Sequence, residues 1–268
     1  MSLSTQGSDF AAVVLAGDRR PDDPLVRHTG ACCKALVAID GTPMLQSVVA
    51  VLEHSGLVRQ VLLSGPSRRC LETVPWLKAA LKDGRIQWLE PQASPSTSAY
   101  AAMQRLPAGT PVLVTTADHP LLRPEIVDHF LRAALDTHAD VVVGLSRFSS
   151  IRDRFPDVRK TVLRFRDGGF CGCNLFAFLT PRSRRVADAW RRVEQQRKSP
   201  LRVMGQLGWR SVLGYVLGRL SLDRALDELS RRMQVRIRPV ILPFPEAAID
   251  VDSIADQRLV ESLEGTRR

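Results

Sequence analysis

PVLVTTADHPLL, residues 111–122, begins with a short apolar run, which is followed by polar residues and a proline. The run Val112–Val114 is wholly apolar, which predicts a strand buried on both faces of a sheet. The strand should end before Pro120, because proline cannot extend a central strand. Asp118 is therefore expected at the carboxyl end of a central strand, in the crevice where open α/β sheets bind their ligands. A carboxylate there can help to hold a divalent cation and a phosphate, although an aspartate before a proline is equally typical of a turn.

Similar apolar runs alternate with helical patterns along the first 145 residues. The runs predict strands near 11–15, 58–64, 86–89 and 140–145, and helical patterns cover 44–54, 100–106 and 124–136. A further short strand is expected at 34–37. The alternation is typical of an α/β fold with a doubly wound, mostly parallel sheet.

Three regions are expected along the chain. Residues 1–180 should form the core, residues 181–238 an arginine-rich helical insert or subdomain, and residues 239–268 a strand and helix that complete the core. The insert's amphipathic pattern is typical of helices packed by an apolar face, with solvated arginines outside. A lid or a membrane-surface element is the less favoured interpretation. A nucleic-acid surface ranks last, because no nucleic-acid-binding motif is present.

The segment after the first strand combines a glycine with basic residues. The strand runs into Ala16-Gly17 and then into a polar loop with Arg20 and Arg27, which leads to Lys34. A strand followed by glycine and a basic loop is a place where α/β proteins hold phosphates on backbone N–H groups. An ordinary surface loop with solvated arginines would look the same.

Two later segments carry further candidate ligands. GGFCGCNLFAF, residues 168–178, places glycines and Asn174 before an apolar run, which suits either a close approach to a ligand or a β-turn into a strand. Asp250 and Asp252 are one residue apart in an extended segment, so both can face one cation.

The amino-acid composition limits which binding partners and which cellular compartment are expected. The 268 residues carry a formal net charge of +10, which favours an anionic ligand, a nucleic acid or an acidic membrane surface. No segment is apolar for long enough to span a bilayer, and residues 1–10 lack the order of a signal peptide. The five cysteines are an odd number, which argues against a disulfide framework and for the cytoplasm. The pairs Cys32-Cys33 and Cys171/Cys173 are expected to be buried thiols.

Five segments in this order resemble the nucleotidyltransferase superfamily, in the branch of molybdenum-cofactor guanylyltransferase and related cytidylyltransferases. They are VVLAG at 13–17, KALVAIDGTPML at 34–45, VTTADHPLL at 114–122, GCNLFAF at 172–178 and IDVDSIADQRL at 249–259. The resemblance implies a Rossmann-like sheet of the nucleotide-diphospho-sugar transferase type. The arginine-rich helices have no counterpart in it.

The resemblance also implies roles for individual residues. Lys34 would contact phosphate oxygens, Asp118 would bind a catalytic Mg²⁺, and Asp252 would supply the second carboxylate, with Asp250 nearby. The nucleotide would be held by the loop Leu15, Ala16 and Gly17 with Arg20 and Arg27, and by Ser64, Gly65, Ser94, Thr97 and Ser98 near the base. Gly172 and Asn174 would face the acceptor.

Two departures from the family pattern lie near the triphosphate. The family loop reads Leu-Ala-Gly-Gly-x-Gly-x-Arg, whereas Asp18 and Arg20 stand at the second and third glycines here. The proline usual before the lysine is Cys33. Arg20 or Arg27 could compensate for the missing glycines.

These features predict an Mg²⁺-dependent nucleotidyltransferase. It would move an NMP group, with CMP favoured, from an NTP to a phosphorylated small-molecule acceptor and release pyrophosphate. One alternative is a glycosyltransferase of related fold, in which Asp250-Val251-Asp252 would bind the metal of a sugar nucleotide. The other is a non-catalytic, membrane-associated nucleotide-binding protein. Peripheral membrane contact is a further expectation, and no oligomeric state is predicted.

Overall fold

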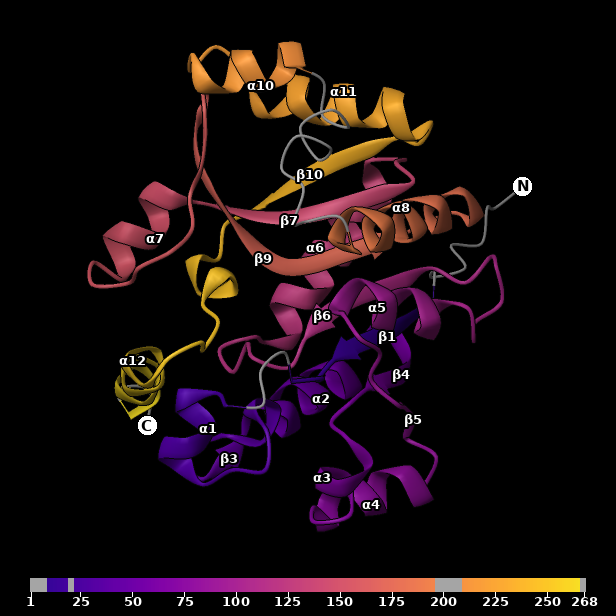
Figure 1. Ribbon diagram of the computed structural model, residues 1–268, viewed down its shortest axis with the longest axis vertical. Helices are drawn as coiled ribbons and strands as arrows, with labels where there is room; N and C mark the ends of the chain where they lie inside the picture. The colour runs from indigo at the N-terminus through magenta and orange to yellow at the C-terminus, as the bar shows by residue number, and fades with distance from the viewer. Residues whose placement is uncertain (1–8, 19–21, 196–208, 266–268) are drawn as a thin grey trace.

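The computed structural model of the chain describes residues 9–18, 22–195 and 209–265 (Figure 1). An eight-stranded sheet runs through it in the order β10-β7-β9-β6-β1-β4-β5, and β8 pairs with β9. The strands are β1 (Phe10–Leu15), β4 (Val58–Ser64), β5 (Ile86–Leu89), β6 (Val112–Thr116), β7 (Val141–Arg147), β8 (Leu163–Phe165), β9 (Gly168–Phe178) and β10 (Ile237–Leu242).

The sheet is mostly parallel. Strand β1 pairs in parallel with β4 and β6, β4 with β5, and β7 with β10. Strand β9 runs antiparallel to β6, β7 and β8. The predicted α/β class with a mostly parallel, Rossmann-like sheet is confirmed, and Val112–Val114 lies in a central strand whose burial is nearly complete.

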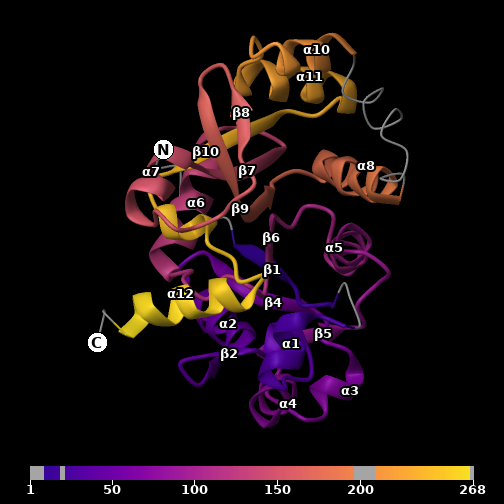
Figure 2. The same ribbon diagram turned by 60° about the vertical axis from the view of Figure 1, so that its left-hand side comes forward.

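Helices cover both faces of this sheet (Figures 1 and 2). One apolar cluster joins α2 and α6 to the sheet, and a second joins α5 and α8 to its other face. The helices are α1 (Pro24–Thr29), α2 (Met44–His54), α3 (Arg68–Leu71), α4 (Pro75–Lys82), α5 (Pro95–Met103), α6 (Pro124–Asp136), α7 (Phe148–Arg154), α8 (Arg184–Gln195), α10 (Trp209–Val216), α11 (Leu222–Met233) and α12 (Ile254–Gly265). Short 3₁₀ turns occupy Lys34–Leu36, Pro181–Ser183 and Pro245–Ala248, and a small ribbon pairs β2 (Ala38–Ile39) with β3 (Thr42–Pro43).

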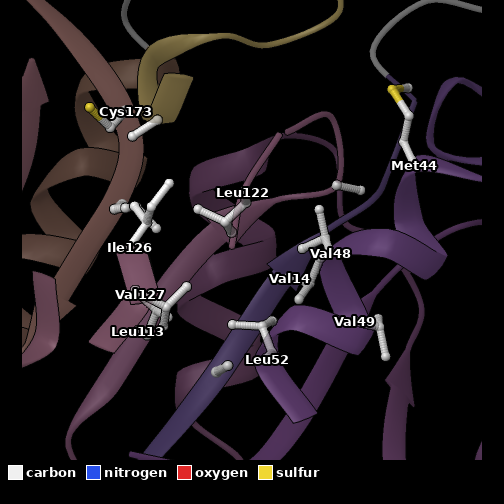
Figure 3. Packing of buried hydrophobic residues seen from close by; sticks show 14 of the residues in the cluster. Val14, Met44, Val48, Val49, Leu52, Leu113, Leu122, Ile126, Val127 and Cys173 are labelled. Atoms are coloured by element: carbon white, nitrogen blue, oxygen red, sulfur yellow. The ribbon is translucent and has the colours of Figure 1, made fainter. Parts of the chain in front are cut away.

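The two apolar clusters arise because successive side chains of a strand point to opposite faces of the sheet. Ala12 and Val14 of β1 belong to the cluster with α2 and α6, whereas Ala11 and Val13 belong to the other. Figure 3 shows Val14 and Leu113 of the sheet among side chains of α2 and α6. Because both faces are covered, β1 and β6 read as continuous apolar runs rather than alternating ones.

Two local expectations were wrong. The predicted strand at 34–37 is a 3₁₀ turn over Lys34–Leu36, in which the N–H of Val37 donates to the carbonyl of Lys34. Cys32 forms a disulfide with Cys70 of α3, across a sequence separation of 38 and a Cα–Cα distance of 5.6 Å. The fold brings these two residues together, and their spacing in the chain contains no sign of it. Cys33, Cys171 and Cys173 are free and buried, as expected.

The arginine-rich segment contains helices α8, α10 and α11, while residues 196–208 lie outside the described part of the chain. Strand β10 starts at Ile237, and α12 follows it at the C-terminal end. Within residues 9–18, 22–195 and 209–265, none of the helices is long and apolar enough to cross a bilayer.

Candidate active site

A cavity of about 500 Å³ opens where β1 and β6 end. Leu15 and Thr116, the last residues of these strands, both line it. The rest of the lining includes five aspartates and one lysine: Asp18, Asp23, Asp118, Asp250, Asp252 and Lys34. A strongly acidic cavity in a chain with a net charge of +10 calls for cations, because like charges at short range repel.

Asp118 lies two residues beyond the end of β6, as the sequence predicts. Its Oδ1 accepts a 2.6 Å hydrogen bond from Thr116 Oγ1, and its Oδ2 lies 2.7 Å from Lys34 Nζ. Burial raises the pKa of the Asp118 carboxyl, but the nearby charge of Lys34 and the hydrogen bonds from Lys34 and Thr116 outweigh burial. The pKa therefore falls to about 2, and Asp118 is ionised at neutral pH.

Lys34 bridges two carboxylates that are far apart in the sequence. Its Nζ contacts Oδ2 of Asp118 and Oδ1 of Asp252, and its side chain is 20% exposed. Burial lowers the pKa of Lys34, yet attraction to Asp118 and hydrogen bonds to both aspartates leave it raised. The backbone N–H of Lys34 also donates to Asp18 Oδ1 at 3.0 Å, which ties the lysine to the loop after β1.

The C-terminal segment is fastened to the end of β6. The N–H of Val251 donates to the carbonyl of Asp118 at 3.0 Å, so Asp250 and Asp252 lie beside the central strand. Both aspartates line the cavity, but they contact different lysines: Asp252 pairs with Lys34, and Asp250 pairs with Lys160.

A buried histidine, His119, lies between Asp118 and Asn174. The amide nitrogen of Asn174 lies 2.8 Å from Nε2 of His119, so the amide donates to an unprotonated ring nitrogen. His119 is 1% exposed, and burial lowers its pKa against the attraction of Asp118 and Asp250. A neutral His119 thus holds Asn174, which lines the cavity from β9.

The loop after β1 is tightly packed where it enters the cavity. A side chain at Gly17 would place its Cβ 2.9 Å from Cβ of Pro91. Gly65 has a φ of +91°, and a Cβ there would lie 2.7 Å from the Gly17 nitrogen. The carbonyl of Ser64 accepts from the N–H of Ala16 at 2.8 Å. Ser64 and Gly65 therefore pack directly against the loop after β1.

The predicted site residues divide into three groups. Those lining the cavity are Leu15, Gly17, Lys34, Asp118, Asn174, Asp250 and Asp252. Ala16, Ser64, Gly65, Ser94, Thr97, Ser98 and Gly172 do not line it, and Ser94 caps α5 by accepting from the N–H of Thr97. Arg27 is exposed on α1 and pairs with Asp22 at 2.9 Å, whereas Arg20 lies outside the described residues.

Several residues of the site were not predicted from the sequence. Asp18, Asp23, Pro95 and Thr116 line the cavity, and Lys160 reaches it through Asp250. Thr116 lies two residues before Asp118, so its proximity was readable from the strand end. Lys160 had one compositional signal: the chain has 5 lysines among its 38 basic residues.

The carboxylates suit a hard divalent cation such as Mg²⁺. Asp118 and Asp252 both approach the ammonium of Lys34, so one cation already lies between them. Within the described residues, no three His, Cys, Asp or Glu side chains form a metal cage by themselves. Mg²⁺ does not require one, since it is commonly held by one or two carboxylates together with water and substrate phosphates.

Comparison with known proteins identifies the family of this chain. The model of the MobA-like NTP transferase domain matches residues 12–207, which include β1, Lys34, Asp118 and β9. The chain belongs to this family. The match ends before Asp250 and Asp252, so the carboxylates of the C-terminal segment rest on the structure alone.

One curated relative of this chain is a nucleotidyltransferase. A 2-C-methyl-D-erythritol 4-phosphate cytidylyltransferase of Frankia casuarinae is 31% identical over 159 residues, which are 59% of this chain and 56% of that protein. The chain thus matches little more than half the length of this curated relative.

Solved structures extend the likeness to nearly the whole chain. A hypothetical transferase from Thermus thermophilus is 28% identical with a TM-score of 0.75, covering 93% of this chain and 99% of the other. CMP:2-keto-3-deoxy-manno-octonic acid synthetase, complexed with CTP, is 17% identical with a TM-score of 0.58 and covers 97% of this chain and 100% of its own. 4-Diphosphocytidyl-2C-methyl-D-erythritol synthase of Anaerococcus prevotii is 10% identical with a TM-score of 0.59, at 97% coverage of both chains. At these two lower identities the likeness concerns the fold.

Proposed function

We propose that this protein transfers an NMP group from an NTP to a phosphorylated small-molecule acceptor and releases pyrophosphate. The observation that carries the proposal is the meeting of Lys34, Asp118 and Asp252 at one cavity, at the carboxyl end of the central strands. Open α/β sheets bind nucleotides at this edge. A cytidine nucleotide is favoured, because the relative from Frankia casuarinae is named a cytidylyltransferase.

The reaction brings two polyanions together, so the site must neutralise negative charge. Mg²⁺ bound by Asp118 and Asp252, with Asp250 nearby, would supply this charge for in-line attack on the α-phosphorus. Lys34 would donate to the phosphate oxygens, and the backbone around Gly17 would face the triphosphate. Asn174, oriented by His119, would donate to the acceptor.

The experiment is nucleotide binding by calorimetry, with ATP, GTP, CTP and UTP, first with Mg²⁺ and then with EDTA. CTP should bind most tightly, and only with the metal present. Asp118→Ala should abolish this metal-dependent binding, because it removes a carboxylate from the proposed cation site. Once an acceptor is known, the same variant should slow turnover on the order of 100-fold or more.

A matched control is Glu72→Ala, which changes an exposed acidic residue at the end of α3. It should bind nucleotide like the wild type. Failure of all four nucleotides to bind would refute the proposed donor. Binding that is equally tight in EDTA would refute the role of the metal.

We also propose peripheral contact with an anionic membrane. The five large apolar side chains that are exposed in the described chain come from two neighbouring segments: Leu163 of β8, and Leu213, Tyr215, Val216 and Leu217 at the end of α10. The N–H of Arg164 donates to the Tyr215 hydroxyl at 3.3 Å, and the Phe165 and Tyr215 rings lie 5.5 Å apart. The exposed side chains of Arg164, Arg166 and Arg219 adjoin this apolar surface. Apolar side chains surrounded by arginines suit a surface of anionic lipid.

A further inference from the structure

The three aspartates proposed to serve the metal and the substrates each form an ion pair with a lysine. Lys34 is shared by Asp118 and Asp252, and Lys160 is paired with Asp250. The two lysines are largely withdrawn from solvent, with side chains 20% and 13% exposed, whereas the side chain of Asp252 is 69% exposed.

Such pairs restrict the entry of a metal. A divalent cation that binds between Asp118 Oδ2 and Asp252 Oδ1 would occupy the position of the Lys34 ammonium, and the two cations would repel at this distance. Lys34 would then have to leave its carboxylates. Leaving a half-buried ammonium without a partner is unfavourable, because burial penalises an unpaired charge.

An incoming phosphate resolves this conflict. An ammonium group has three donors on a flexible stem, so it can turn from a carboxylate to a phosphate oxygen without losing its hydrogen bonds. The chain has 33 arginines and 5 lysines, yet lysines hold both of these positions. A guanidinium has a rigid planar fork and would be less suited to such an exchange.

We propose that Lys34 and Lys160 are exchangeable counter-cations. They block metal binding to the aspartates until the lysines bind substrate phosphates instead. Lys34 would turn to the triphosphate of the NTP, and Lys160 to the phosphate of the acceptor. This assigns Lys160 to the acceptor's anion, and it rests on the proposed function.

One consequence is that metal and nucleotide bind together. If nucleotide raises the affinity for metal by some factor, metal raises the affinity for nucleotide by the same factor. Coupling of this kind is typically about 5- to 150-fold. Binding of the metal would thus favour binding of the nucleotide, and binding of the nucleotide would favour binding of the metal.

The test is Mn²⁺ binding to the full chain, measured from the electron paramagnetic resonance signal of free Mn²⁺. Wild-type protein alone should bind Mn²⁺ weakly, and CTP should strengthen binding, beyond what the CTP itself chelates, by about 5- to 150-fold. Cytidine, which lacks phosphates, should have no effect. These arms need no variant.

Variants then separate the two lysines. Lys34→Met and Lys160→Met should each strengthen Mn²⁺ binding without nucleotide, and Lys34→Met should also reduce the effect of CTP. Lys34→Arg keeps the charge and should bind Mn²⁺ as weakly as the wild type. Lys78→Met, at an exposed position on α4, is the matched control and should change nothing. Methyl phosphate added to the CTP-loaded protein should strengthen Mn²⁺ binding further in the wild type and not in Lys160→Met.

The outcomes distinguish this inference from the proposed function. Tight Mn²⁺ binding by the wild type without nucleotide would overturn the inference, as would lysine variants whose Mn²⁺ affinity equals that of Lys78→Met. If CTP strengthens Mn²⁺ binding but Lys34→Met and Lys160→Met behave like Lys78→Met, the counter-cation role fails and the proposed function stands. If no nucleotide binds but both Met variants gain Mn²⁺ affinity, the proposed function fails and the closed carboxylates are supported.

Discussion

Cys33 immediately precedes Lys34, but its chemistry is suppressed by its surroundings. Burial, reinforced by the charge of Asp18, raises the pKa of the Cys33 thiol to about 12. Burial likewise raises the pKa of Cys173 to about 12. Since the thiolate is the nucleophile, a raised pKa makes a cysteine less reactive at any pH below it.

We therefore expect neither thiol to react with iodoacetamide at pH 8 in the native protein. At that pH about one thiol in ten thousand would be ionised at a pKa near 12, even before the reagent's lack of access is considered. Mass spectrometry after labelling should show adducts at Cys33 and Cys173 only in denaturant, and native labelling should begin only as the pH approaches 12. An adduct at Cys33 in the native protein at pH 8 would contradict the packing described here.

Residues differ in how far the sequence predicts them. Asp118 could be placed, because it follows a buried strand whose carboxyl end faces the ligand crevice. Lys34 was placed only through the family resemblance, since the strand expected at 34–37 is a 3₁₀ turn. Lys160 could not, because it belongs to an irregular segment between α7 and β8 and meets Asp250 only through the fold. Contacts over 90 residues leave no periodic trace in a single sequence.

Among the elements, the strands and helices of the core were predictable, whereas the link between Cys32 and α3 was not. Buried strands and amphipathic helices are local patterns with periods of 2 and 3.6. The disulfide joins the segment just before Lys34 to α3, which follows β4. It therefore tethers the segment that leads into Lys34 to α3.

Loss of this disulfide should lower the free energy of unfolding by about 2–4 kcal/mol, because closure of a loop of this length restricts the unfolded chain. Chemical denaturation of the wild type and of Cys70→Ser, each with and without dithiothreitol, measures the effect. Dithiothreitol should destabilise the wild type to the level of the variant and leave Cys70→Ser unchanged. Equal stability of all four samples would show that the crosslink contributes nothing to folding.

At the scale of the whole molecule, two charged features lie on different parts of the sheet. The acidic cavity lies where β1 and β6 end. The elements β8 and α10, which carry the exposed apolar side chains, lie at the end of the molecule opposite α3 and α4 (Figures 1 and 2). The alternation of strands and helices predicted the sheet because one rule governs the entire core. The position of α10 follows from packing onto β8, through Tyr215, and the amphipathic pattern alone left a lid, a packed helix and a membrane surface open.

The membrane contact predicts binding to vesicles that contain anionic phosphatidylglycerol, and no binding to pure phosphatidylcholine vesicles. The interaction should weaken as salt rises from 0.05 M to 0.5 M, because screening shortens the reach of the arginines. Replacing Leu213, Val216 and Leu217 together by Ser should reduce flotation with anionic vesicles, since those side chains supply the apolar contact. The matched control is Lys78→Gln with Lys82→Gln, which removes two positive charges from α4 and should leave flotation intact. If the Ser variant instead converts a dimer to a monomer while vesicle binding persists, the apolar side chains serve contact between two copies of the chain, and the membrane assignment is wrong.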